Sequence, residues 1–206
     1  ADGLVFHRTQ VLQALLAFVV FSMVASGTYL INDSVDVEAD RRHPTKRNRP
    51  IAAGVVPIPL AIGMAVQLHG GGLGLGLARS WQFCLVVTIY AVQTTLYSFW
   101  LKNVVIVDVM VLALGFLLRV VAGSIVANVT NFSPWLYVCV TLLALFLGFG
   151  KRRHELSLLA DGASGHRASL NEYNLPLLDQ IIGIVTTSTF IAYTLYGIEA
   201  QTALAN

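Results

Sequence analysis

Long apolar runs make up most of the chain, and short polar clusters separate them. Six of these runs reach or approach the roughly 20 residues that a helix needs to cross the hydrocarbon core of a bilayer. The six runs are Val11–Ile31, Pro57–Leu77, Gln82–Leu101, Asp108–Ala127, Pro134–Gly150 and Ile181–Ala200. Backbone polar groups in lipid must pair within their own segment. The pattern therefore predicts an all-α fold, a polytopic membrane helical bundle with six visible spans.

Two of the six runs are less regular than the others. Pro57–Leu77 contains a glycine-rich stretch between Gly70 and Gly76, which indicates either close packing against another helix or a broken helix. Pro134–Gly150 is short for a span, and its helix can extend past Lys151.

The composition excludes several classes of protein. Hydrophobic residues make up 56% of the 206 residues and charged residues only 12%, about half the share of a typical soluble domain. This balance argues against a soluble domain and against a disordered chain, and a net charge of +2 gives no sign of a nucleic-acid partner. Cys84 and Cys139 lie in apolar runs without the spacing of a disulfide or zinc framework.

The charged residues are concentrated in two places. Nine lie between Asp33 and Arg49, and seven more lie between Lys151 and Glu172. The first, third and fifth connections between spans hold ten basic residues, whereas the second and fourth hold only Arg79. The positive-inside rule then predicts one transmembrane domain, residues 1–206, with segments 32–56 and 151–180 as charged loops on the cytoplasmic side.

Three aspartates follow the first span at helical spacing. At 100° per residue, Asp33, Asp36 and Asp40 share one helix face within about 60°, and Glu38 falls on the other side. Aligned carboxylates repel one another unless a cation neutralises them, and their hard oxygen atoms suit Mg²⁺. The spacing therefore predicts a magnesium site, with an ordinary solvated helix end as the alternative.

A basic segment containing two prolines follows the aspartates and is predicted to form a loop. Beside a metal-binding face, Lys46, Arg47 and Arg49 are candidates to bind phosphate oxygens, since ammonium and guanidinium groups pair strongly with phosphate. The alternative is an anchor that contacts anionic lipid headgroups.

The fourth span carries two ionisable residues. Asp108 and Arg119 are eleven residues apart, which places them on one helix face, and ionisable residues within a span indicate function. The alternative is a structural ion pair with another helix. Tyr97 and Lys102 lie near the end of the preceding span, where Lys102 is either functional or extended toward the interface.

The fifth connection begins with three consecutive basic residues, Lys151, Arg152 and Arg153, followed by Glu155. We expect the basic residues to contribute a second side to an anion pocket. For Glu155 the alternative is a surface salt bridge to Lys151 at i,i+4 spacing.

The residues after the first span resemble a known family. The motif consists of Asn32-Asp33-x-x-Asp36-x-x-x-Asp40, then His43-Pro44-Thr45-Lys46 and Arg49-Pro50-Ile51-Ala52-Ala53-Gly54. It is similar to the first motif of the UbiA superfamily of membrane prenyltransferases. The resemblance extends over about residues 11–200.

Further matches are similar to the branch of decaprenyl-phosphate phosphoribosyltransferases within this superfamily. They are Tyr97-Ser98-x-x-Leu101-Lys102, Asp108, Gly115-Phe116-x-Leu118-Arg119-x-x-Ala122-Gly123 and Lys151-Arg152-Arg153-His154-Glu155-Leu156. The superfamily has nine transmembrane helices, so one helix before Val11 and two after Ala200 would account for the difference. A second aspartate motif, DxxxD, is typical of members that use prenyl diphosphates, and Lys151–Asp161 occupies its place here.

The resemblance implies a Mg²⁺-dependent enzyme in a bacterial plasma membrane, with its active site facing the cytoplasm. The implied reaction transfers 5-phosphoribosyl from phosphoribosyl diphosphate to a polyprenyl phosphate such as decaprenyl phosphate, a step in arabinan cell-wall precursor synthesis. Membrane lipid is an implied partner, nucleic acid is not, and a homo-oligomer is left open. The implied catalytic residues, the first three also metal ligands, are Asp33, Asp36, Asp40, Lys46, Tyr97 and Lys102. The implied substrate-binding residues are Asn32, Arg47, Arg49, Asp108, Arg119, Lys151, Arg152, Arg153 and Glu155.

Two other functions stay open on the sequence. One is transfer of a prenyl group from its diphosphate to an aromatic acceptor. The other is a transporter or lipid-binding protein in which Asp108 and Arg119 line a pathway.

Overall fold

A computed structural model of the chain describes residues 8–127, 133–160 and 172–205, and within these ranges the regular elements are helices. Six of the helices are long and apolar enough to cross a membrane, which confirms the predicted helical membrane fold. The spans are Val11–Val35, Ile58–Arg79, Trp81–Phe99, Val107–Val126, Pro134–Ser157 and Leu175–Glu199. Large apolar side chains such as Phe18, Trp81 and Phe190 are exposed on them, as a lipid environment requires.

Contacts along the chain divide it into two compact units. The first unit comprises Ala1–Phe99 with Val121–Val129, and the second comprises Trp100–Val120 with Thr130–Asn206. The prediction of one domain over residues 1–206 stays a prediction.

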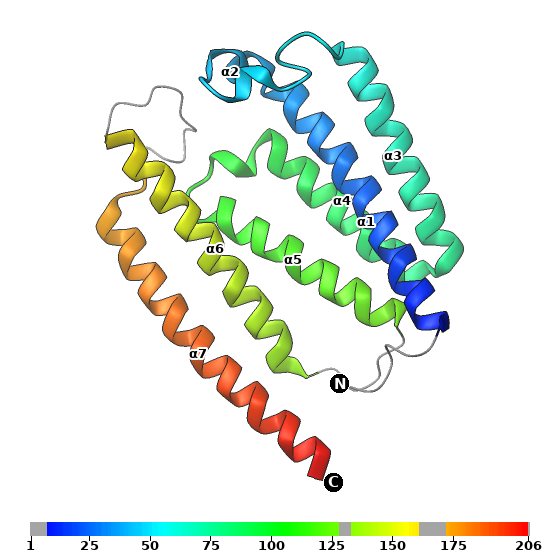
Figure 1. Ribbon diagram of the computed structural model, residues 1–206, viewed down its shortest axis with the longest axis vertical. Helices are drawn as coiled ribbons and strands as arrows, with labels where there is room; N and C mark the ends of the chain where they lie inside the picture. The colour runs from blue at the N-terminus through cyan, green and yellow to red at the C-terminus, as the bar shows by residue number, and fades with distance from the viewer. Residues whose placement is uncertain (1–7, 128–132, 161–171, 206) are drawn as a thin grey trace. The chain divides into compact units, whose positions relative to one another are not determined.

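Three long helices make up most of the first unit: α1 (Arg8–Val35), α3 (Ile58–Arg79) and α4 (Trp81–Phe99). Helices α1 and α3 lie side by side (Figure 1). Their approach is so close that a Cβ atom at Gly72 would lie 2.7 Å from a methyl group of Val24, and one at Gly27 would lie 2.4 Å from the His69 ring. The glycine-rich stretch therefore belongs to an unbroken helix that packs closely, the first of the two predicted alternatives.

The polar segment between α1 and α3 is folded back on the helices. It contains α2 (Val37–Arg42) and the short 3₁₀ helix η2 (Lys46–Asn48). The buried side chains of Val37 and Ile51 pack with Ala61 at the start of α3. This apolar cluster fixes the position of the turns that carry the charged residues.

The second unit contains η3 (Leu101–Asn103), the larger part of α5 (Val107–Val126), α6 (Pro134–Ala160) and α7 (Leu175–Ala205). Helices α6 and α7 lie side by side (Figure 1). Buried Val109, Phe149, Tyr173 and Leu178 form the core of this unit.

The predicted loop 151–180 is mostly helical where the structure describes it. Residues 151–160 continue α6 past the first charged residues, and residues 175–180 begin α7. Residues 161–171, among them Asp161 and Arg167, lie outside the described residues.

Candidate functional site

The aspartates of the first unit lie on two consecutive helices instead of one. Helix α1 ends at Val35, and Asp36 has φ −91° and ψ 7° before α2 begins. Helical hydrogen bonds continue across this break, from Asp36 N–H to Asn32 (2.9 Å) and from Asp40 N–H to Asp36 (2.8 Å). Asp33 and Asp40 are two turns apart and therefore keep the common side that the spacing predicts.

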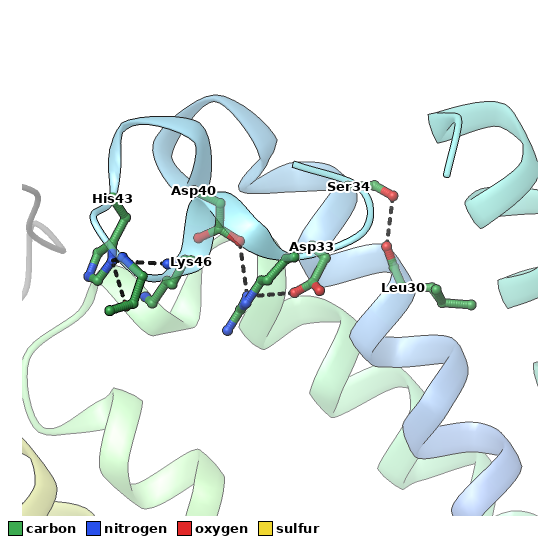
Figure 2. Close-up of polar contacts among 8 residues, drawn as sticks. Leu30, Asp33, Ser34, Asp40, His43 and Lys46 are labelled. Atoms are coloured by element: carbon green, nitrogen blue, oxygen red, sulfur yellow. Dashed lines mark hydrogen bonds and ion pairs between the residues drawn. The ribbon is translucent and has the colours of Figure 1, made fainter. Parts of the chain in front are cut away.

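One arginine joins the two aspartates. The Arg49 Nη1 atom donates to Asp33 Oδ1 at 2.7 Å and to Asp40 Oδ2 at 2.9 Å (Figure 2). The exposed fractions of the side chains are 39% for Arg49, 24% for Asp33 and 6% for Asp40. We call Asp33, Asp40 and Arg49 the Arg49 cluster; it pairs two converging carboxylates with a cation that solvent can reach.

Glu38 lies away from this cluster, as the helical spacing predicts. It forms an exposed ion pair with Arg41 at 2.9 Å, and Arg41 also donates to the Ala52 carbonyl at 3.2 Å. Glu38 and Arg41 therefore provide matched controls for the charged residues of the Arg49 cluster.

The donor set of the cluster suits a magnesium ion. Both carboxylates point at one nitrogen atom, so a positive charge already occupies the place where they converge. Within the described ranges, three His, Cys, Asp or Glu side chains are nowhere gathered closely enough to hold a metal by themselves. Mg²⁺ usually binds one or two carboxylates and completes its shell with water and phosphate oxygens, so two converging aspartates are sufficient. Asp36 lies half-buried at the helix break, and its role as a third ligand stays a prediction.

His43 organises the basic turn, a role that the sequence analysis did not assign. Its Nδ1 atom accepts the backbone N–H groups of Thr45 and Lys46, each at 3.3 Å (Figure 2). These bonds shape the start of η2, which in turn positions Lys46 and Arg49. The only signal for this role was the place of His43 inside the family motif.

The other predicted residues of the first unit differ in exposure. Lys46 is half-buried, whereas Arg47 is exposed. Tyr97 is half-buried near the end of α4, and Asn32 is half-buried near the end of α1. Their predicted roles in binding substrate stay predictions.

The second unit contains a charge network whose centre, Asp108 and Arg152, is buried. Asp108 is 0% exposed and accepts a hydrogen bond from Arg152 Nε at 2.6 Å, and Arg152 is only 1% exposed. The Tyr173 hydroxyl donates to the other Asp108 oxygen at 2.8 Å. Arg152 also pairs with Glu155, one turn along the same helix. We call Asp108, Arg152, Glu155 and Tyr173 the Arg152 network.

Tyr173 connects this network to the backbone. Its hydroxyl accepts the N–H of Ile106, which has an unusual positive φ of 68°, at 2.7 Å. Burial raises the pKa of the Tyr173 phenol above its ordinary value, and the hydrogen bond to Asp108 raises it further. The phenol therefore stays protonated and keeps both hydrogen bonds at neutral pH.

The network bears on three of the predictions made from the sequence. Arg152 is buried against Asp108, so the three basic residues do not form one open side of an anion pocket. Glu155 pairs with Arg152 and not with Lys151. Asp108 has its ion pair with Arg152 of another helix, the alternative that the sequence analysis left open.

The remaining predicted residues of the second unit are dispersed. Arg153 forms an exposed pair with Asp179 of α7, and Lys151 is exposed. Arg119 is exposed, with its guanidinium carbon 5.3 Å from the centre of the Phe116 ring. Lys102 is buried in η3, so it does not extend toward solvent as the alternative proposed.

Comparison with known proteins decides the family. The sequence profile of the UbiA prenyltransferase family matches residues 1–156, which include both the Arg49 cluster and most of the Arg152 network. The chain belongs to the UbiA prenyltransferase family. UbiA proteins are membrane proteins, in agreement with the six apolar helices.

Curated relatives place this UbiA chain near one branch. It is 36% identical over 197 residues to a decaprenyl-phosphate phosphoribosyltransferase of Corynebacterium glutamicum, covering 95% of this chain and 59% of the relative. It is 38% identical over 184 residues to the protein of the same name in Mycobacterium tuberculosis, covering 89% and 61%. The chain thus spans about three fifths of the length of these relatives.

A solved UbiA structure has the same fold. The UbiA homolog from Archaeoglobus fulgidus, bound to DMAPP and Mg²⁺, matches with a TM-score of 0.78 at 17% identity, over 89% of this chain and 65% of that chain. At this identity the match supports the helical arrangement alone.

Proposed function

We propose that this UbiA protein transfers a 5-phosphoribosyl group from phosphoribosyl diphosphate to a polyprenyl phosphate at the cytoplasmic face of a bacterial plasma membrane. The observation that carries the proposal is the convergence of Asp33 and Asp40 on one cation beside a basic turn. The names of the relatives support the choice of substrates.

In this proposal Asp33 and Asp40 hold Mg²⁺, with Asp36 as the further expected ligand. The bound metal supplies positive charge that stabilises the diphosphate leaving group. The Asp40 carboxylate is held in place because α2 packs through Val37 against Ile51 and Ala61.

The basic residues bind and orient the donor. Arg49 presents a planar fork of N–H donors, and Lys46 on η2 presents an ammonium group, which suit phosphate oxygens. Arg47 is exposed on the same short helix and is assigned the same role. Contacts of this kind hold the ribose in position and stabilise charge that develops as the diphosphate departs.

The transfer itself needs no strong base. An oxygen of the lipid phosphate attacks the anomeric carbon of the ribose, a new C–O bond forms, and the bond from that carbon to the diphosphate oxygen breaks. The electron pair leaves with the diphosphate. The attacking phosphate is already anionic at neutral pH, because the second pKa of a phosphate monoester is about 6.

The test is a transfer assay with the full protein in membranes or proteoliposomes. Labelled phosphoribosyl diphosphate, Mg²⁺ and polyprenyl phosphate should give a lipid-extractable labelled product. A ribose diphosphate analogue without the 5-phosphate should bind roughly 10- to 150-fold more weakly, since one lost charged contact is worth about 1.5–3 kcal/mol. Transfer from a prenyl diphosphate to an aromatic acceptor, with no use of phosphoribosyl diphosphate, would contradict the proposal.

A further inference from the structure

Arg49 occupies the position that a metal ion needs. A single nitrogen, Nη1, contacts oxygen atoms of both Asp33 and Asp40 at 2.7 and 2.9 Å, so the guanidinium neutralises the two carboxylates together. A hydrated magnesium ion that approaches these oxygens must displace it. The displaced guanidinium would then lie beside a divalent cation of the same sign, which opposes binding of the metal alone.

The surroundings of Arg49 allow its side chain to move while its backbone stays in place. Its N–H donates to the Lys46 carbonyl at 2.9 Å, and its carbonyl accepts the N–H of Ala53 at 2.8 Å. These bonds anchor the main chain at the end of η2. The side chain is 39% exposed, so solvent and ligands reach the guanidinium without a change of fold.

A diphosphate removes the conflict between the two cations. Its oxygens provide ligands for the metal and acceptors for the arginine at the same time, so each cation gains a partner when Arg49 leaves the carboxylates. Binding of the metal and of the diphosphate then becomes coupled, and the coupling is reciprocal by thermodynamic linkage.

We propose, resting on the proposed function, that Arg49 is a removable counter-ion of Asp33 and Asp40, which keeps the metal from binding alone and makes the metal and the diphosphate bind as a pair. Arg49 is in this sense a positioning residue for the metal as well as a ligand for the donor. Loss of an ordinary binding residue weakens binding of the metal. Removal of the Arg49 charge should instead strengthen binding of the metal in the absence of diphosphate.

The experiment measures Mn²⁺ binding by electron paramagnetic resonance on the purified protein in detergent, with and without inorganic diphosphate at matched free Mn²⁺. The wild-type protein should bind the metal weakly alone and roughly tenfold or more tightly with diphosphate. Arg49→Gln should bind the metal alone roughly tenfold or more tightly than wild type, and the further gain from diphosphate should be smaller than in wild type.

Two further variants control the comparison. Arg41→Gln removes an equal charge from the same segment, where Arg41 pairs with exposed Glu38, and should behave as wild type. Arg49→Lys keeps the positive charge and should keep metal binding weak in the absence of diphosphate. Unchanged or weakened metal binding in Arg49→Gln would overturn the inference, as would wild-type protein that binds the metal equally well with and without diphosphate.

Asp40→Asn separates this inference from the proposed function. If Asp40→Asn abolishes metal binding in the presence of diphosphate and Arg49→Gln leaves binding of the metal alone unchanged, only the counter-ion role of Arg49 is wrong. If Asp40→Asn binds the metal as wild type does in the presence of diphosphate, the Arg49 cluster is not the metal site and the proposed function loses its main support.

Discussion

In the part of the chain that the structure describes, two arginines each join two carboxylates, and they differ in their access to solvent. Arg49 joins Asp33 and Asp40, with exposed fractions of 39%, 24% and 6%. Arg152 joins Asp108 and Glu155, with exposed fractions of 1%, 0% and 32%. The same pairing chemistry thus occurs once at an accessible turn and once inside a helix core.

This difference separates a site that can exchange partners from one that cannot. Both carboxylate oxygens of Asp108 are hydrogen-bonded, one to Arg152 and the other to the Tyr173 hydroxyl. Removal of Asp108 or of Arg152 would leave the other as an unpaired buried charge, which destabilises the fold. The Arg49 cluster is held by an arginine that water reaches, so a competing cation or anion can replace its contacts. We therefore propose that the Arg49 cluster takes part in the chemistry and that the Arg152 network supports the structure. A transport pathway along Asp108 gains no support from this geometry.

The largest expected effect on stability comes from the buried arginine. Arg152→Met leaves the Asp108 carboxylate buried without its cation and should lower the free energy of unfolding by about 3–5 kcal/mol. Removal of the other arginine by Arg49→Gln should lower the free energy of unfolding by about 1 kcal/mol or less, because its pairs are partly solvated. Denaturant unfolding in detergent measures both, and equal losses would remove the distinction between the two clusters.

The largest expected effect on activity comes from the accessible cluster. Asp40→Asn should reduce phosphoribosyl transfer about 100-fold or more, because one fixed charge at the reaction centre is lost. Glu38→Gln, on the other side of α2, should stay within about twofold. The measurement is the lipid-labelling rate on variants with matched thermal stability. Similar losses in the two variants would show that helix position does not decide the role.

An intermediate effect is expected at Tyr173. Tyr173→Phe removes the donor to Asp108 and the acceptor for the Ile106 N–H, and should lower the free energy of unfolding by about 1–3 kcal/mol. The pKa of Tyr173 is raised in the folded protein, so its contribution is fully present below the ordinary phenol pKa of 10.0 and is lost as the pH rises further. The stability difference between wild type and Tyr173→Phe should therefore shrink above pH 10. A difference that stays constant or grows there would contradict the assigned network.

The smallest effect is expected at a third arginine pair. Arg153 and Asp179 are both about half-exposed, at 47% and 52%, and link α6 to α7 at the surface. Arg153→Gln should leave the midpoint of thermal unfolding unchanged, since exposed ion pairs contribute little. A shift as large as that of Arg152→Met would show that exposure does not rank these pairs.

The sequence was sufficient for the features that depend on periodicity. Apolar runs predicted the six spans, and 100° spacing placed Asp33 and Asp40 on one side although the helix is interrupted at Asp36. Residues seven positions apart stay aligned when the hydrogen bonds across the break are helical.

Features that depend on tertiary contacts could not be predicted from the periodicity of the sequence. The contact of Arg49 with both aspartates depends on how a turn of two prolines and a 3₁₀ helix folds back. Of three adjacent basic residues, only Arg152 points inward, because packing of α6 against Val109 and Tyr173 selects that face. Tyr173 precedes α7 outside any apolar period, so nothing in its spacing marked it as a partner of Asp108.

The most direct test locates the metal on the chain. Fe²⁺ placed in the site with inorganic diphosphate, followed by ascorbate and peroxide, cleaves the backbone close to the bound ion. We predict cleavage between Asn32 and Asp40 in the wild-type protein, and none there in Asp40→Asn. Cleavage near Asp108 or Arg152 in place of this segment would contradict the assignment of the Arg49 cluster as the reacting site.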